Sequence, residues 1–253
     1  MRGVAARAAE TVRAACLQPS PPLQLDDAAL FITGDPFAGV PDGRIPRAPV
    51  APGDAWRLSD PMEAVRAAAA YAALSAALER PLTLDDLIAA HAALDANLPE
   101  EVRAYMRPGR LRVVATTMRR EGEGQVYAPP PPDMAHDLLR QLLDYVEAVR
   151  QAGAITLIQC ALVYYQFVAI HPFHDGNGRL SRALARLLLE RHHAGAGALD
   201  LTAMVRVNRA YHDYRIVAVH RSGRWAEWVH FFCQMLIRRC AAAQEGKGAA
   251  ARG

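Results

Sequence analysis

One apolar segment, residues 154–170, constrains the fold of this chain more than any other feature. Its sequence, AITLIQCALVYYQFVAI, places apolar side chains on nearly every side of a helix. A helix of that kind is stable in water only when other elements surround it. We therefore predict a central helix in a bundle, with the residues that follow it anchored directly to the core.

Capping signals predict where two other helices begin. Asp60 stands before Pro61, which suits the first helical position, and Thr83 stands three residues before Asp86. We predict that helices run from these caps to about residues 78 and 94.

Apolar residues spaced three and four apart predict more helices. After Asp133, one helical face carries Met134, Leu138, Leu142, Tyr145 and Val149. Similar patterns cover residues 180–192, 208–220 and 225–239. Alanine is abundant and 52% of the residues are apolar, which also favours helices.

Two short β-prone runs, residues 110–115 and 124–128, interrupt the helical patterns. The charged, glycine-rich turn REGEG lies between them, which favours a small β-hairpin. The predicted fold class is therefore mainly α, a helical bundle with a short β-hairpin. An extended peptide could pair with the edge of this hairpin, and the hairpin could equally be no more than a lid.

Prolines and glycines divide the chain into parts. Between Pro19 and Pro52 they recur too closely for a long helix or a central strand. We predict a proline-rich N-terminal arm or linker over residues 1–58, a compact domain over residues 59–240 and a flexible tail over residues 241–253.

Charge and composition argue against several classes of protein. The formal net charge is only +3 and the basic residues are scattered, so no nucleic-acid partner is predicted. No run reaches the ~18–20 apolar residues that cross a bilayer, so no membrane association is predicted. The cysteines lack CxxC spacing and are predicted to be buried thiols in a reducing compartment: Cys16, Cys160, Cys233 and Cys240. A cytoplasmic location is expected, and export as an effector stays open.

The loop after the central helix contains Gly176, Asn177 and Gly178 directly before another helix. Two glycines around one residue let backbone N–H groups turn inward as a nest for an anion, at the positive end of the helix dipole. Arg179 and Arg182 lie three residues apart on that helix, and their guanidinium groups can grip phosphate oxygens. The pattern predicts a phosphate-binding site.

Two further residues of the loop suit a nucleotide reaction. Asp175 supplies a carboxylate oxygen of the kind that Mg²⁺ binds beside substrate phosphates. His171 titrates near neutral pH and can take the proton of an attacking hydroxyl. Each residue alone has a plainer explanation, as loop, solvated helix face or helix end, but all of them fall in one window, HPFHDGNGRLSR.

This window resembles the signature of the Fic family, HxFx(D/E)GNGRxxR, at every defined position. The resemblance extends over about residues 59–237, because Fic domains also carry a β-hairpin flap followed by prolines, here residues 127–130. It implies a helical Fic domain that uses ATP and Mg²⁺, with His171 as catalytic base and Asp175 as metal ligand. It also implies that the phosphates bind to the rest of the motif: Gly176, Asn177, Gly178, Arg179 and, for the γ-phosphate, Arg182.

Gly178 distinguishes two branches of the family, because the branch that transfers phosphate carries a lysine at this position. The resemblance therefore implies a protein adenylyltransferase. Such an enzyme moves AMP from ATP to a Ser, Thr or Tyr hydroxyl of a protein docked at the flap, here about residues 110–128. Transfer of UMP, phosphocholine or phosphate stays an alternative, and so does a non-catalytic interaction module with the Fic fold.

Two weaker features concern the nucleoside and the control of activity. Asn208, Tyr211 and Tyr214 resemble the nucleoside-facing helix of the family, although a core role suits them as well. Many Fic proteins carry an inhibitory glutamate in a helix of pattern (S/T)xxxE(G/N). Glu121 matches this pattern but falls in the predicted hairpin turn, and Glu245 departs from it because Ala241 replaces the hydroxyl residue. A separate antitoxin-like inhibitor, contacts in a homo-oligomer and an unrestrained enzyme therefore stay open.

Overall fold

A computed structural model describes residues 61–236, apart from residues 78, 97, 117, 121–123, 128, 152–156 and 193–200. Several predictions lie outside the described residues. These are the N-terminal arm, the tail, the cap at Asp60 and the residues Cys16, Cys240, Glu121 and Glu245.

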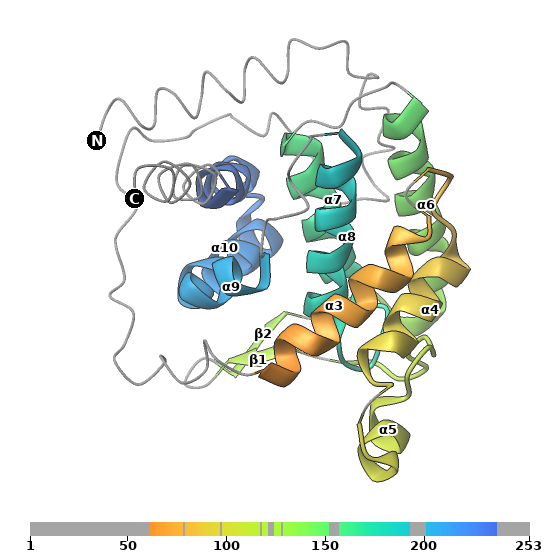
Figure 1. Cartoon of the computed structure of the whole chain (residues 1–253). Coiled ribbons are helices and arrows are strands. Elements are labelled where there is room, and N and C mark those ends of the chain that lie inside the picture. The colour runs from red at the N-terminus through yellow and green to blue at the C-terminus, as the bar shows by residue number, and fades with distance from the viewer. Residues whose placement is uncertain are drawn as a thin grey trace, which may run out of the picture.

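Helices make up most of the described part of the chain, which confirms the mainly α fold class (Figure 1). The labelled helices are α3 (Pro61–Ser75), α4 (Leu84–Leu94), α5 (Glu100–Met106), α6 (Pro132–Gln151), α7 (Leu157–Ile170), α8 (Asn177–His192), α9 (Leu201–Val207) and α10 (Arg209–Ser222). A further helical segment covers residues 225–236.

The predicted central helix is α7. Every residue from Ile158 to Ile170 is buried, as expected for a helix with apolar side chains all round. α7 packs against α6 and α8, and α8 also packs against α3, α4 and α9. Figure 1 shows α7 and α8 between α6 and α4 on one side and α9 and α10 on the other. The segment between α7 and α8 is therefore fixed to the core at both ends.

Aromatic side chains join the end of the described chain to α7. Trp228 is fully buried, and its indole N–H donates a hydrogen bond to the carbonyl of Ala161, at 2.9 Å. Its ring centroid lies 5.4 Å from that of Tyr164. Cys160 and Cys233 are buried thiols outside any disulfide, as predicted for these two.

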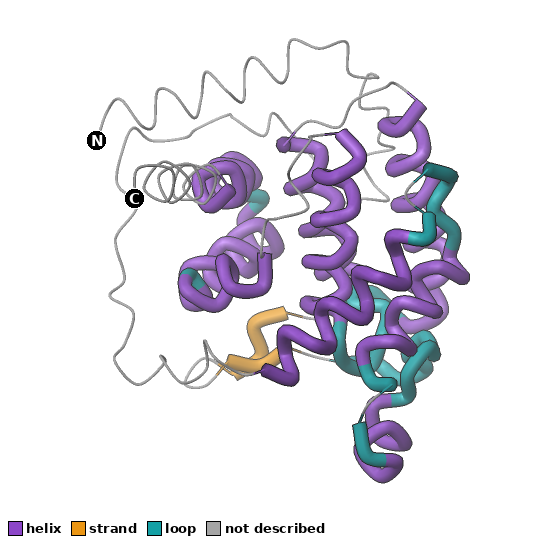
Figure 2. Tube along the Cα trace, viewed as in Figure 1, coloured by secondary structure: helices purple, strands orange, loops and turns teal. Residues whose placement is uncertain are grey.

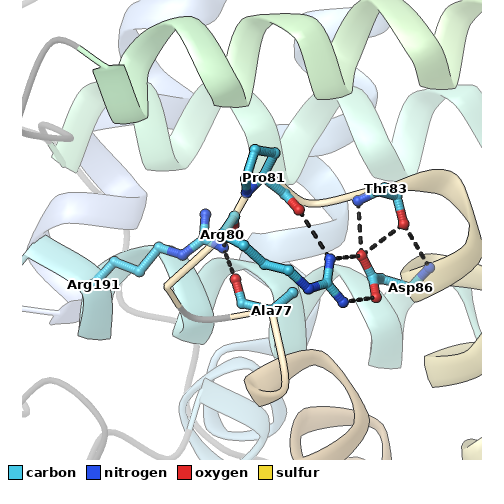
Figure 3. Close-up of polar contacts among 6 residues, drawn as sticks. All are labelled: Ala77, Arg80, Pro81, Thr83, Asp86 and Arg191. Atoms are coloured by element: carbon cyan, nitrogen blue, oxygen red, sulfur yellow. Dashed lines mark hydrogen bonds and ion pairs between the residues drawn. The ribbon is translucent and has the colours of Figure 1, made fainter.

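The start of α4 is fixed by the predicted capping box and by two arginines (Figure 3). Thr83 and Asp86 exchange hydrogen bonds, and both carboxylate oxygens of Asp86 accept from the guanidinium of Arg80, at 2.6 and 2.8 Å. Arg191, near the end of α8, donates to the carbonyls of Ala77 and Arg80. These bonds hold the α3–α4 turn against the far end of α8.

One of the two predicted strands is wrong. Residues 110–115 form no strand, and only Leu111 makes an isolated antiparallel bridge, to Phe173. β1 (Met118–Arg120) instead pairs antiparallel with β2 (Gly124–Tyr127). The run before β1 bonds to the α7–α8 loop, where the backbone N–H of Arg112 donates to the carbonyl of Pro172 at 2.9 Å. A β-prone pattern cannot distinguish these two kinds of partner, and the role of β1 and β2 as a flap stays a prediction.

Other differences concern helix ends and faces. α3 ends at Ser75, short of the predicted end, and α5 and α9 are short helices that the periodic patterns do not predict. On α6, Leu138, Leu142 and Val149 are buried as predicted, but Met134 is 47% exposed. Periodicity identifies the buried face of a helix, but not how far along the helix its neighbours reach.

The described helices include none that is both long and apolar enough to cross a membrane. Figure 2 shows a large part of the loop structure at one end of the α7–α8 pair, the end where the two strands also lie.

Candidate functional site

The loop between α7 and α8 is short and tightly packed. Phe173, in its middle, is fully buried, and its ring stacks on that of His91 with centroids 3.9 Å apart and planes within 5°. α8 begins at Asn177 rather than at Leu180 as predicted. The predicted nest therefore lies in the first turn of the helix, where backbone N–H groups have no partners within the helix.

His171 directly follows α7 and has a left-handed backbone, with φ of 49°. Its Nδ1 lies 3.3 Å from the carbonyl oxygen of Val168. Because a carbonyl can only accept, Nδ1 carries the proton and Nε2 is the nitrogen that can accept one. Burial lowers the pKa of His171, so the imidazole is neutral at neutral pH. This is the state that a general base requires.

Asp175 lies at the turn of the loop and forms an ion pair with Arg179, one helical turn further on. Burial acts to raise the pKa of Asp175, but the charge of Arg179 and the N–H of Gly176 outweigh it, so the pKa lies below its usual value. The side chain is still 44% exposed. It is therefore an ionised carboxylate within reach of a ligand from solvent.

The two glycines of the nest have different reasons to be glycine. Gly176 has φ of 78°, and a Cβ there would lie 2.9 Å from Cδ1 of the buried Leu94. The fold itself therefore requires Gly176. Gly178 is helical, and a Cβ there would meet only Nη1 of Arg182, at an ordinary 3.5 Å. Glycine destabilises a helix by ~1 kcal/mol relative to alanine. Nothing in the described residues therefore explains why position 178 is a glycine.

Asn177 uses its side chain inside the protein. The amide oxygen accepts from the backbone N–H of Phe173 and the amide nitrogen donates to the carbonyl of Phe173, both at 2.9 Å. The residue is only 2% exposed. The side chain of Asn177 therefore holds the loop closed. Its backbone N–H is the group that can serve as the predicted phosphate contact.

Arg182 is buried beside the nest, at 8% exposure. Its Nε donates to Oγ1 of Thr202 on α9, at 3.2 Å, and its Nη1 faces Gly178. Arg179 and Arg182 both lie next to the nest, as predicted. Their guanidinium groups turn apart, one to the carboxylate of Asp175 and the other to α9.

A chain of polar groups lies next to Arg182, and its first two members, Tyr164 and His212, are buried. The hydroxyl of Tyr164 lies 2.9 Å from Nε2 of His212, whose Nδ1 lies 2.8 Å from Asp213. Burial acts to raise the pKa of Asp213, but His212 and Arg209 hold it below its usual value, so the carboxylate accepts from Nδ1–H. Nε2 of His212 therefore accepts from the Tyr164 hydroxyl. Burial raises the pKa of Tyr164, and the nearby charge of Arg182 opposes that rise.

The three predicted nucleoside residues lie on α10 and at its start. Asn208 precedes the first turn, and its side chain donates to the carbonyl of Met204 at 2.8 Å. Tyr211 is partly buried against the core, and Tyr214 is 45% exposed, with its hydroxyl 3.2 Å from Arg224. A nucleoside contact by these residues stays a prediction.

Sequence reasoning missed two residues that hold the loop. His91 on α4 is fully buried and accepts from the N–H of Gly109 at Nδ1, at 2.8 Å. Its Nε2–H therefore donates to the carbonyl of Asp175, at 2.9 Å. Arg112 is only 4% exposed and bonds to the carbonyl of His171. For His91 a signal existed, because it lies on the same helical face as the apolar Leu87 and Leu94.

The chain is similar to known proteins over the same region. Residues 81–189 match the Fic/DOC family model. Protein adenylyltransferase fic-1 of Caenorhabditis elegans is 26% identical over 110 residues, which is 44% of this chain and 20% of that protein. This chain therefore spans about a fifth of the length of that relative.

Two solved structures share the fold. A Fic family protein from Desulfovibrio desulfuricans G20 aligns with a TM-score of 0.57 at 24% identity, over 96% of this chain and 66% of the other. The second Fic domain of IbpA, a protein of Histophilus somni, was solved covalently tethered to Cdc42. It aligns with a TM-score of 0.52 at 16% identity, over 91% of this chain and 70% of the other. The nest, the carboxylate and His171 all lie within residues 81–189, the part of this chain that matches the Fic/DOC family.

Proposed function

We propose that this chain transfers AMP from ATP to a hydroxyl side chain of another protein. The observation that carries the proposal is Gly178, a helical glycine that the fold does not need, next to the guanidinium of Arg182. Without a side chain there, a phosphate can approach the N–H groups of the first turn of α8. The relatives named protein adenylyltransferase favour AMP as the transferred group.

In this proposal, different residues around the nest bind different phosphates of ATP. The N–H groups of Asn177 and Gly178 face an oxygen of the α-phosphate, and Arg179 and Arg182 balance the charge of the remaining phosphates. Arg179 is paired with Asp175 before ATP binds. Its guanidinium has further donors for phosphate, since the ion pair uses only part of the five.

The donor set around Asp175 suits a Mg²⁺ ion that arrives with ATP. No cluster of three or more His, Cys, Asp or Glu side chains that could hold a metal occurs among the described residues. Mg²⁺ at nucleotide sites is commonly held by one or two carboxylates together with phosphates and water. The ionised, partly exposed Asp175 fits that role. The metal would neutralise phosphate charge as the leaving group departs.

In the proposed reaction, the hydroxyl oxygen of the target attacks the α-phosphorus of ATP. A bond forms between them, and the bond from the α-phosphorus to the oxygen bridging to the β-phosphorus breaks. The hydroxyl proton passes to Nε2 of His171, and pyrophosphate leaves with the electron pair of the broken bond. His171 starts the step neutral because burial lowers its pKa. The N–H groups of the nest stabilise negative charge on the α-phosphate.

A protein target could dock along the segment before β1. Val113 and Val114 are 72% and 52% exposed beside the loop that carries His171. An extended peptide that lies along this segment would be held mainly by backbone hydrogen bonds, as when a peptide pairs with an exposed strand edge. The structural relative tethered to Cdc42 has a protein as its partner, which supports a protein target here. A compact domain over residues 59–240 and a cytoplasmic site of action are part of the same proposal.

Labelled ATP tests the proposal. The protein is mixed with Mg²⁺, a cell lysate and ATP labelled at either the α- or the γ-phosphate. Transfer of AMP leaves the α-label on a protein and releases the γ-label as pyrophosphate, whereas γ-label on the acceptor would indicate phosphoryl transfer. His171→Ala should abolish labelling, and His136→Ala, an exposed histidine on α6, should not. Absence of α-label under all conditions would contradict the proposal and favour a binding module.

A further inference from the structure

We propose that Arg112 is a positioning residue for His171, because its buried guanidinium holds the peptide that follows α7 and thereby fixes the imidazole. The inference rests on the proposed function, in which His171 is the base. It adds a residue outside the Fic motif, from a segment far from the loop in sequence.

The guanidinium of Arg112 is surrounded by backbone carbonyls. Its Nε donates to His171 O at 2.7 Å, and its Nη2 donates to Ile170 O at 3.3 Å and to Pro130 O. Its Nη1 lies 3.4 Å from Val114 O. The residue is only 4% exposed, so these contacts are made away from water. Bonds from a charged donor are stronger than neutral ones, especially when they are buried.

The end of α7 explains why an arginine suits this place. The last carbonyls of a helix have no partners within it and form the negative end of the helix dipole. The planar guanidinium carries donors in a fixed fork, so one side chain can serve two neighbouring carbonyls at once. Arg112 does this for Ile170 and His171. A lysine would bring the charge but only a single donor atom.

The backbone of the same segment reinforces the contact. Arg112 N donates to Pro172 O at 2.9 Å, and Leu111 forms a bridge to Phe173. The segment therefore holds the peptides on both sides of His171. This matters because His171 has φ of 49°, a left-handed conformation that residues with a Cβ adopt reluctantly. External bonds are needed to keep it there.

Arg112 also brings a positive charge close to the imidazole. The charged groups that act on His171 are Arg112, which lowers its pKa, and Asp175, which raises it. Burial is the larger cause of the lowered pKa. Arg112 thus favours the neutral imidazole in addition to holding its peptide, and these two effects can be separated by substitution.

The test uses two substitutions of Arg112 and one matched control. Arg112→Gln removes the charge and the fork, and Arg112→Lys keeps the charge but not the fork. Arg140→Gln removes the same charge from an exposed position on α6 and should behave as the wild type. Each variant is checked for folding by circular dichroism. Each is then measured for AMP transfer against pH and for the titration of the His171 ring by NMR, assigned with His171→Ala.

We expect Arg112→Gln to lower kcat about tenfold to a hundredfold, since small misplacement of a catalytic group costs that much. KM for ATP should stay within about threefold. The acid limb of the pH profile and the His171 titration should both move to higher pH. Arg112→Lys should keep the titration near that of the wild type and still lose kcat.

The outcomes separate the two proposals. A folded Arg112→Gln with wild-type kcat and an unchanged His171 titration would overturn the inference. If Arg112→Gln does not fold, Arg112→Lys decides, and wild-type kcat in that variant would overturn the anchoring role. The NMR titration needs no turnover. A wild type that transfers no AMP therefore defeats the proposed function while Arg112 is still tested.

Discussion

The loop between α7 and α8 is held in different ways on its two sides. On the side of α4, His91 and Arg112 bond to backbone carbonyls, those of Asp175 and His171. On the side of α9 and α10, Thr202 contacts a side chain, the guanidinium of Arg182. The first side therefore sets the path of the backbone, and with it the positions of the proposed base and metal ligand. The second side sets the direction of one phosphate-binding group.

The largest effect on stability should come from a substitution at Gly176, on the side of the loop that is held through its backbone. Gly176→Ala forces a left-handed backbone on a residue with a Cβ and crowds Leu94, so we expect a loss of about 2–4 kcal/mol in the free energy of unfolding. The matched change is Gly178→Ala, which should leave stability unchanged or raise it by up to ~1 kcal/mol while weakening ATP binding. Urea denaturation and calorimetric ATP titration measure the two effects. Equal losses of stability would contradict the distinction between these glycines.

The next largest effect should come from His91. His91→Phe keeps an aromatic ring against Phe173 but leaves the N–H of Gly109 and the carbonyl of Asp175 without their partner. We expect a loss of about 2–3 kcal/mol in urea denaturation, because unpaired buried polar groups are costly.

His91→Gln should recover part of that loss, since its amide nitrogen can take the place of Nε2. AMP transfer should also need more Mg²⁺ in His91→Phe than in the wild type, because Asp175 is less well placed. The exposed His136 provides the control, His136→Phe. Wild-type stability in His91→Phe would show that the ring matters only through packing.

The pH dependence of stability should involve both sides of the loop. Burial lowers the pKa of His91 on the backbone side and of His212 on the other. As the pH falls below about 6.5, the unfolded chain takes up protons before the folded one does. Stability that is fully present above that pH is then lost by about 1.4 kcal/mol per pH unit for each histidine that stays neutral in the folded state.

The urea concentration at the midpoint of unfolding, measured between about pH 7.5 and 5, tests this expectation. His91→Gln and His212→Asn should each make the decline shallower, by a similar amount. A decline with an unchanged slope in both variants would mean that other groups control it.

The smallest effect on stability should come from the side of the loop that faces α9 and α10. Tyr164→Phe removes the hydroxyl that bonds to His212 near Arg182, so we expect a loss of about 1 kcal/mol in stability. KM for ATP should rise a few-fold, and the pH profile of transfer should keep its position, since His171 is untouched. Steady-state kinetics against pH measure both. A shifted acid limb would show that the two sides of the loop are not separate.

The sequence predicts the loop well because the residues of the motif are contiguous. Short-range chemistry alone indicates Gly176, the carboxylate of Asp175 and the paired arginines. The capping box at Thr83 and the buried central helix are likewise local patterns, and both are confirmed.

The sequence does not show which residues from distant parts of the chain pack against the loop. His91 lies 84 positions before Asp175, and Arg112 lies 59 positions before His171. Neither contact follows from periodicity, because it depends on how α4 and the segment before β1 pack on the loop. The same cause explains the wrong strand at residues 110–115, whose backbone bonds to the loop. The helices α5 and α9 have only 7 residues each, too few for a helical period to repeat clearly.

Gly178 has a consequence for anyone who engineers this protein. It lies in a helix where alanine fits, so a library screened only for thermostability or soluble yield should enrich alanine at this position. Such a screen would select against the proposed ATP site without any sign of damage to the fold. A stabilised version of this chain is therefore best obtained with position 178 held fixed, and drift at that position can serve as an early sign that a selection is discarding nucleotide binding.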